Sequence, residues 1–243
     1  MTTSCDPTGP LLVLTAMPEE ASPVTARLAG PRELPTPFTG GVAAVRGTLE
    51  GLDTVVVTTG IGVAAATAAA TWGILSHRPR AVVAAGSCGG LAADVEVGTL
   101  IVGESFTYSI ADATAFGYAP GQLPGGPERF LAEPGWVDAA EQAARKDPGD
   151  PGVRRGLMLT GDAFVTAPLA EPMRQRFPAA LSADMETTAS ARTASQLGVP
   201  FVALRAVSDL CGPAAGQQFH LEIDLVAEIS ARAVAELARD LAE

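Results

Sequence analysis

Residues that could build a ligand site follow the predicted strands of this sequence at the points where each strand ends. Five such positions recur along the chain, namely Glu20, Gly60, Ser87, Phe164 and Asp209. In layered α/β proteins ligands gather at the carboxyl ends of the strands, so we expect these residues to share one edge of a sheet. For any one of the glycines taken alone, an ordinary tight turn is the favoured explanation.

The supply of reactive residue types argues against several chemistries. The chain has two histidines, His77 and His220, and three widely separated cysteines, Cys5, Cys88 and Cys211. A Ser-His-Asp triad requires a histidine and a structural zinc site requires several histidines or cysteines, and this chain contains few of either. We therefore expect neither a metal nor a cofactor. The few, odd-numbered cysteines suit a reducing compartment and offer no disulfide framework.

Composition and charge narrow the class of protein. Of 243 residues, 47% are hydrophobic and 18% are charged, which provides a large buried core and excludes intrinsic disorder for most of the chain. The net charge of −11 and a single lysine leave no basic surface that could follow a phosphate backbone, so nucleic acid is not expected as a partner. Apolar stretches stop short of the roughly 18 residues that a spanning helix needs, and no secretory signal is apparent. We therefore expect a cytoplasmic protein without a membrane segment.

Predicted strands and helices alternate along the chain. Strands are predicted over residues 11–15, 42–49, 54–58, 81–85, 100–103, 106–109, 156–160 and 201–207. Helices are predicted after residue 16 and over residues 63–76, 136–146, 185–197 and 221–241. A Gly- and Pro-rich loop at 119–129 is long enough to be a candidate for function. This order predicts a layered α/β domain.

Four segments resemble, in order and spacing, the signature of the nucleoside phosphorylase and nucleosidase superfamily. They are Thr59–Gly62, Ala85–Gly90, Ala183–Glu186 and Arg205–Asp209. Within it the match is nearest to the 5′-methylthioadenosine/S-adenosylhomocysteine nucleosidases, and the segments at 111–125 and 161–164 resemble that family too. The motifs span nearly the whole chain, and together they are far more specific than any one of them alone.

The resemblance implies both a fold and an activity. The fold is a single-domain three-layer α/β/α sandwich with a central mixed twisted sheet over residues 11–243. The resemblance begins at about Leu11, and we expect residues 1–10 to be a flexible N-terminal segment. The activity is hydrolysis of the N-glycosidic bond of 5′-methylthioadenosine and S-adenosylhomocysteine, with 5′-deoxyadenosine as a further candidate substrate. The products are adenine and the 5-substituted ribose, as in methionine salvage. The reaction needs a proton donor at adenine N7, a group that binds the ribose hydroxyls and a water at C1′.

The resemblance also implies roles for individual residues. Asp209 matches the aspartate that donates to N7, which requires its pKa to rise or a proton to arrive with the substrate. Glu20 matches the general base for the water, which Ser87 and Arg205 would help to place. Glu186 matches the acceptor of both ribose hydroxyls. The other substrate-binding matches are Ile61, Phe116, Pro124, Phe164, Val165, Met185 and Ser208.

Two of these matches imply a second copy of the chain. In the family the apolar pocket for the 5′ substituent is completed by the partner subunit, so we expect a homodimer in which Phe116 and Pro124 complete the partner's pocket. Either Phe219 or Ile223 is expected to cover the 5′ group.

The absence of phosphate-binding arginines favours water over phosphate as the nucleophile. Superfamily phosphorylases hold phosphate with arginines near the first strand and before the central glycine turn. Here Ala84 and Ala85 precede Gly86, while Glu19 and Glu20 occupy the first-strand turn, where like charge would repel an anion. We therefore predict a hydrolase, with Glu19 facing solvent.

Other interpretations of the same residues stay open. If the substrate carries a bulkier 5′ group, the protein is a futalosine or aminodeoxyfutalosine hydrolase. If the chain has lost turnover, it is a purine-nucleoside-binding protein. Asp209 could also be a helix N-cap, and Asp184 and Glu186 could be solvated acids at the start of a helix.

Overall fold

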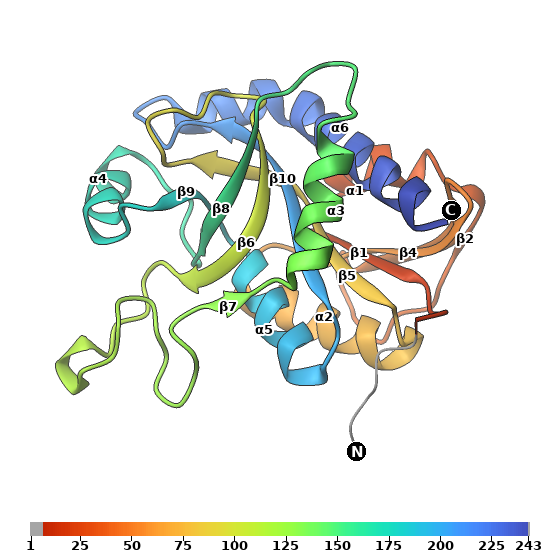
Figure 1. Cartoon of the computed structure of the whole chain (residues 1–243), viewed down its shortest axis with the longest axis horizontal. Coiled ribbons are helices and arrows are strands. Elements are labelled where there is room, and N and C mark those ends of the chain that lie inside the picture. Colours follow the sequence, from red (N-terminus) through yellow and green to blue (C-terminus); the bar gives the residue numbers. More distant parts are fainter. Residues whose placement is uncertain (1–6, 243) are drawn as a thin grey trace.

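The computed structural model describes residues 7–242, along which single strands or short runs of strands are separated by helices (Figure 1). The strands are β1 (Leu11–Thr15), β2 (Ala29–Glu33), β3 (Ala43–Leu49), β4 (Leu52–Thr58), β5 (Ala81–Gly90), β6 (Leu100–Tyr108), β7 (Phe130–Leu131), β8 (Val153–Thr160), β9 (Ala180–Asp184) and β10 (Phe201–Asp209). The helices are α1 (Pro18–Thr25), α2 (Val63–His77), α3 (Pro134–Ala144), α4 (Ala167–Arg176), α5 (Thr187–Leu197) and α6 (Ala215–Ala242), with a 3₁₀ turn at Thr114–Phe116.

All the described strands join one mixed sheet. Its order is β10-β6-β8-β9-β5-β1-β4-β3-β2, with β7 paired to β6. Strand β10 also pairs with β5, so that β10, β6, β8, β9 and β5 close into a ring. The carboxyl ends of the parallel strands β1, β5 and β10 therefore meet at one edge of the sheet.

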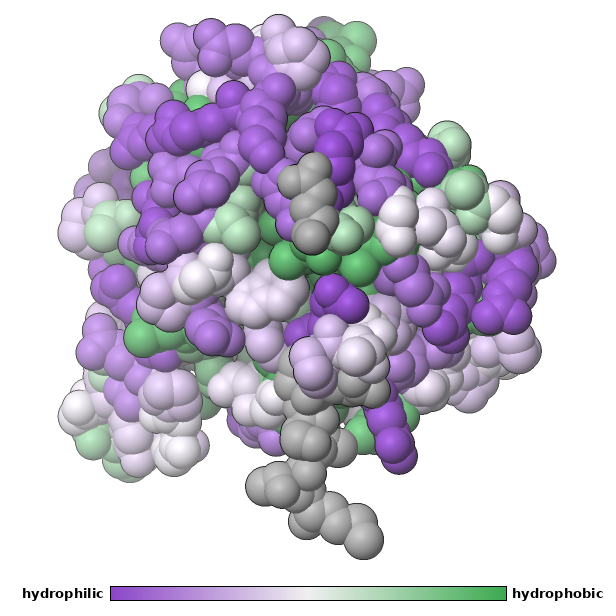
Figure 2. Space-filling view, turned by 45° about the vertical axis from the view of Figure 1, so that its right-hand side comes forward, coloured by the Kyte–Doolittle hydropathy of each residue, from purple (hydrophilic) through white to green (hydrophobic). Residues whose placement is uncertain are grey.

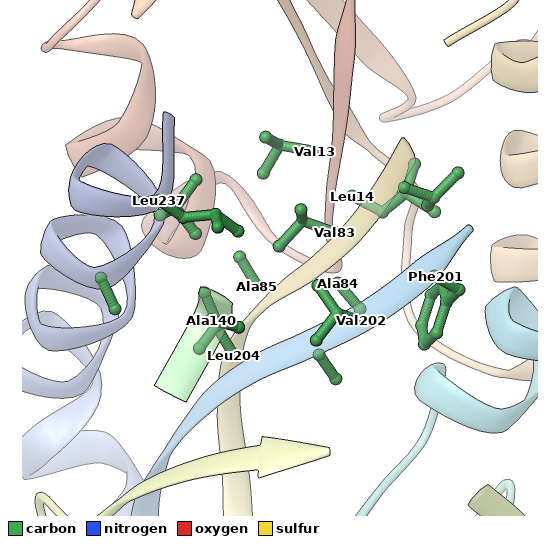
Figure 3. Close-up of a cluster of buried hydrophobic side chains, with 14 of the residues drawn as sticks. Val13, Leu14, Val83, Ala84, Ala85, Ala140, Phe201, Val202, Leu204 and Leu237 are labelled. Atoms are coloured by element: carbon green, nitrogen blue, oxygen red, sulfur yellow. The ribbon is translucent and has the colours of Figure 1, made fainter. Parts of the chain in front are cut away.

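Helices cover both faces of the sheet and complete three layers. On one face α6 packs against α1 and α3, and on the other α2 packs against α5 (Figure 1). Because both faces are covered, every residue of β1 and β10 is buried. In the core, Val13, Val83 and Val202 lie between Leu237 of α6 and Phe201 (Figure 3). The predicted three-layer α/β/α fold is confirmed. At the surface, hydrophilic residues predominate on the face shown in Figure 2.

Several boundaries differ from the sequence prediction. The strand predicted over 81–85 continues through the glycine segment to Gly90, and the two strands predicted over 100–109 are one strand with a register shift between Gly103 and Ser105. Close packing explains the glycines in β5, since a Cβ on Gly89 would lie 2.6 Å from the Cys211 sulfur. Strands β2, β7 and β9 and helix α4 were not predicted at all.

The expected flexible segment at 1–10 falls mostly on residues 1–6, which lie outside the described residues, so it stays a prediction. Gly9 and Pro10 are buried, and their carbonyl oxygens accept hydrogen bonds from Arg80, at 2.9 Å from Nε and 3.0 Å from the backbone nitrogen. Within residues 7–242 no helix is long and apolar enough to cross a membrane.

Candidate active site

A pocket of about 360 Å³ opens at the carboxyl ends of β1, β5, β9 and β10. It is lined by ten of the twelve residues that the sequence singled out, namely Glu20, Ile61, Ser87, Phe164, Val165, Met185, Glu186, Arg205, Ser208 and Asp209. Phe116 and Pro124 do not line it. Segments almost 190 positions apart in the chain therefore converge as the strand-end pattern predicted.

Glu20 enters the pocket from the first turn of α1. The helix begins at Pro18, whose missing N–H is no loss there, and the acids Glu19 and Glu20 suit the helix N-terminus. Glu19 is exposed as expected, whereas Glu20 is buried. Its Oε2 accepts a hydrogen bond from the Ala16 nitrogen at 2.7 Å, and its Oε1 accepts from the Ser87 nitrogen at 2.7 Å and from Ser87 Oγ at 2.8 Å. Three donors thus fix the carboxylate.

The glycine at position 86 makes room for this carboxylate. Gly86 has φ +131°, and a Cβ built there would lie 2.4 Å from Cδ and Oε1 of Glu20. No other residue fits both the backbone and the space. The glycine-rich segment is therefore more than a tight turn, because it lets Glu20 approach the strand.

Glu186 lies just after β9 and lines the same pocket as Glu20. Its Oε1 accepts a hydrogen bond from the Gly62 nitrogen at 2.9 Å, and its Oε2 lies 3.3 Å from Nη2 of Arg205. Burial raises the pKa of Glu186 to about 7; Asp184 and Glu20 add to the rise, while Arg205 and the Gly62 N–H oppose it. Further hydrogen-bond donors that enter the pocket would favour the ionised form of this carboxyl group.

Asp184 lines the pocket, but its Oδ1 is occupied by backbone groups at the start of α5 and by Thr160. Its Oδ1 accepts hydrogen bonds from the backbone nitrogens of Glu186 at 2.9 Å and Thr187 at 2.8 Å, and from Thr160 Oγ1 at 2.9 Å. The interpretation of Asp184 and Glu186 as solvated acids is wrong, because both are buried, although Asp184 does accept hydrogen bonds from the backbone at the start of α5.

Arg205 is a buried cation surrounded by acids. Its Nη1 donates to the Ser87 carbonyl at 2.7 Å, and its Nε lies 4.0 Å from Asp184 Oδ2. Burial alone would lower the pKa of Arg205, but Asp184, Glu186 and Glu20 raise it above its usual value. The guanidinium therefore stays charged and is directed toward protein oxygens.

Asp209 is the last residue of β10 and closes the other end of the pocket. Its Oδ2 accepts a hydrogen bond from Ser208 Oγ at 3.0 Å, and its Oδ1 accepts from the Cys211 nitrogen at 2.9 Å. Burial raises the pKa of Asp209, and these hydrogen bonds only partly offset the rise. The N-cap interpretation is wrong, because the next helix, α6, begins at Ala215.

Apolar side chains form the remaining walls. Phe164 and Phe219 meet edge to face with ring centroids 5.8 Å apart, and both line the pocket. Ile223 instead packs against the main core, so Phe219 is the aromatic that reaches the pocket. Met17 and Cys211 line the pocket without having been predicted; the position of Met17 near Glu20 after β1 was the available signal.

Phe116 lies away from this pocket. It belongs to the 3₁₀ turn in the loop that projects from the body of the molecule at lower left in Figure 1. Its side chain is 83% exposed, and Pro124 in the same loop is exposed as well.

Comparisons with known proteins agree with this geometry. The sequence profile of the phosphorylase superfamily matches residues 10–243. A 5′-methylthioadenosine/S-adenosylhomocysteine nucleosidase of Geobacillus kaustophilus (strain HTA426) is 36% identical over 223 residues, which covers 91% of this chain and 93% of the relative.

Solved structures of such nucleosidases superpose closely on the chain. The enzyme from Neisseria meningitidis, in complex with methylthio-immucillin-A, has a TM-score of 0.90 at 33% identity, covering 96% of this chain and 99% of its own. The enzyme from Colwellia psychrerythraea 34H, in complex with adenine, has a TM-score of 0.91 at 30% identity, covering 96% of each chain. The chain therefore belongs to the phosphorylase superfamily and, within it, to the 5′-methylthioadenosine/S-adenosylhomocysteine nucleosidases.

Proposed function

We propose that the protein hydrolyses the N-glycosidic bond of 5′-methylthioadenosine and S-adenosylhomocysteine, releasing adenine and the 5-thio-substituted ribose, with 5′-deoxyadenosine as a further substrate. One observation carries the proposal: Glu20, Glu186 and Asp209, from three different elements, face one pocket whose other walls are largely apolar. The relatives named above are nucleosidases of this specificity, and one of them holds adenine. Futalosine hydrolysis and binding without turnover are not favoured by these relatives.

Asp209 is the proposed acid for the leaving base. As the bond to C1′ breaks, adenine gains negative charge, and a proton delivered to N7 lets it leave as a neutral molecule. Burial raises the pKa of Asp209, which helps the carboxyl group hold that proton. Phe164 would stack on the purine, Val165 would contact its edge through backbone groups, and Ser208 would orient the acid through its 3.0 Å hydrogen bond.

Glu186 is the proposed anchor of the ribose. Its two oxygens suit two vicinal hydroxyls, which would each donate one hydrogen bond and so compensate the buried charge. Met185 and Ile61 line the pocket beside it. A site built this way should reject 2′-deoxyribosides, because one acceptor would lose its partner.

Glu20 is the proposed general base for the water. Its two oxygens accept three hydrogen bonds from Ala16 and Ser87, which leaves acceptor capacity for a water that faces C1′. Ser87 and Arg205 help to define its position. Positioned proton transfer of this kind contributes about 10²–10⁴-fold in rate.

The charges around the pocket support water rather than phosphate as the nucleophile. Among the described residues that line the pocket, Arg205 is the one cation, and its Nη1 and Nη2 face the Ser87 carbonyl and Glu186. Phosphate would have to enter beside Glu20 and Glu186 without a free guanidinium to balance it.

A homodimer belongs to the same proposal. Phe116 and Pro124 would complete the apolar side of the partner's pocket, and the exposure of both residues in a projecting loop supports this. A cytoplasmic enzyme of methionine salvage is the setting that we propose for the activity. A chain that cleaves substrate efficiently as a monomer at micromolar concentration would contradict the shared pocket.

Incubation of the purified protein with 5′-methylthioadenosine tests the function, with free adenine measured with and without phosphate. Adenine release that is independent of phosphate is expected, and a strict requirement for phosphate would overturn the hydrolase. S-Adenosylhomocysteine, futalosine and aminodeoxyfutalosine serve as parallel substrates, and no release from any 5′-substituted adenosine would leave a binding protein. The variant Glu20→Gln should bind substrate and turn it over poorly.

A further inference from the structure

A second hydrophobic cluster, separate from the main core, lies beneath the Asp209 end of the pocket. It joins α4 to β8, β9 and the segment that follows Asp209. Its members are Leu91, Leu157, Leu159, Val165, Ala170, Met173, Phe177, Ala180, Ala183 and Cys211. Val165, Ala183 and Cys211 of this cluster also line the pocket, so the packing of α4 bears directly on that wall.

Arg174 of α4 links two segments that border this wall. Its Nε donates to the Leu91 carbonyl at 2.8 Å, just after β5, and its Nη2 donates to the Leu210 carbonyl at 3.2 Å. The side chain is half-buried. A planar guanidinium suits this task because its donors are fixed relative to one another.

The Leu210 carbonyl belongs to the same peptide group as the N–H that reaches Asp209. That peptide is trans, so its C=O and N–H point in opposite directions. Arg174 contacts the oxygen on one side, and the Cys211 N–H meets Asp209 Oδ1 at 2.9 Å on the other. Cys211 has φ +54°, a conformation that L side chains avoid unless their surroundings enforce it.

We propose that Arg174 is a positioning residue for Asp209, which holds the Leu210–Cys211 peptide so that its N–H stays on the Asp209 carboxyl group. This inference rests on the proposed role of Asp209 as the acid. Without Arg174, rotation of the peptide would relieve the strain at Cys211 and withdraw the N–H. A cation on the carbonyl oxygen also polarises the peptide and strengthens its N–H as a donor.

The groups that face Asp209 determine the direction of the effect on pH dependence. Cys211 follows it on the same segment, Cys88 faces it from β5, and Arg174 of α4 faces Cys211. The Cys211 N–H favours the ionised carboxylate and so lowers the pKa of Asp209. Loss of that donor should raise this pKa and move the alkaline limb of activity to higher pH, while the misplaced acid lowers the rate.

Three variants on one helix test the proposal. Arg174→Met removes charge and donors, Arg174→Lys keeps the charge and a donor, and Gln175→Ala alters an exposed neighbour whose Nε2 bonds to Glu171 on the same helix. The kcat/KM for 5′-methylthioadenosine is measured as a function of pH, with thermal unfolding as a check on folding. We expect Arg174→Met to lose about 10- to 100-fold in kcat/KM with its alkaline limb displaced upward. Arg174→Lys should recover much of the rate, and Gln175→Ala should match the wild type.

Two results would overturn the proposal. One is a pH profile of Arg174→Met whose alkaline limb coincides with that of the wild type. The other is a kcat/KM of Arg174→Lys that is no higher than that of Arg174→Met. If Arg174→Met fails to fold, the comparison of Arg174→Lys with Gln175→Ala still tests the proposal. The carbonyls of Leu91 and Leu210 need two donors in different directions, so Arg174→Lys should show a partial upward shift of the alkaline limb. Calorimetric titration of adenine across the same pH range separates this inference from the proposed function. A wild type that binds adenine without releasing it from nucleosides would refute the function, while the binding profile would still test Arg174.

Discussion

Replacing Gly86 by alanine should lower the activity sharply by displacing the carboxylate of Glu20. The added Cβ would lie 2.4 Å from Cδ and Oε1 of Glu20 and 2.6 Å from Oε2. Non-bonded heavy atoms sit about 3.5 Å apart, so the carboxylate must move by about 1 Å. A misplacement of that size at a reacting group costs about 100-fold in rate. The move also disturbs the hydrogen bonds from Ala16 and Ser87, and each hydrogen bond to a charged group contributes about 1.5–3 kcal/mol to stability.

The control for this variant is Gly98→Ala. Gly98 also has a positive φ, +89°, but a Cβ there meets only Ile229 Cδ1 at 3.7 Å, so it carries the backbone strain without the collision. Both variants should lose roughly 1–3 kcal/mol through that strain, measured by chemical denaturation. Only Gly86→Ala should lose kcat, measured as adenine released from 5′-methylthioadenosine. Equal kcat values in the two folded variants would refute the account of Glu20.

Three further predictions concern the other walls of the pocket. Burial raises the pKa of Glu186 from 4.5 to about 7. Between these two pH values the folded state binds more protons than the unfolded state. The free energy of unfolding should therefore fall by roughly 3 kcal/mol as pH rises through this range. Denaturation of wild type and Glu186→Gln across pH 4 to 8 checks this, and a constant difference between the two would contradict it. Asp209→Asn cannot supply the proton to N7 and should lose about 10²–10⁴-fold in kcat while still binding substrate; a normal kcat would rule out the assigned acid. Phe219→Ala removes an apolar wall worth about 1.5–3 kcal/mol when buried, so KM should rise by about 10- to 100-fold with kcat largely kept, and an unchanged KM would place the substrate elsewhere.

The sequence was most informative where burial is continuous. Strand β1 was predicted with its observed bounds because both of its faces are covered, which leaves an unbroken apolar run. Strand β2 was missed because all five of its residues are exposed, so no alternation marks it. Helix α4 was missed because Pro172 stands inside it, and an internal proline normally breaks the helical pattern.

Site residues that lie in local sequence motifs were predicted, whereas roles that depend on contacts between distant segments were not. Ten pocket residues lie in motifs that are legible in the chain, such as Glu20 after β1 and Asp209 at the end of β10. Arg174 carries no local mark of its role, because its partner Leu91 lies 83 positions away and the contact exists only after α4 has packed. Gly86 was predicted as a turn, and only the position of Glu20 reveals why a side chain is excluded there.

The most direct test of the central claim is the source of the oxygen that ends at C1′ of the sugar. The protein is incubated with 5′-methylthioadenosine and phosphate in water enriched in oxygen-18, and the sugar product is examined by mass spectrometry. Hydrolysis through a water held by Glu20 predicts methylthioribose that carries the heavy oxygen at C1′, formed at the same rate whether or not phosphate is present. A methylthioribose 1-phosphate whose oxygen comes from phosphate would contradict the account and would assign the pocket to phosphorolysis.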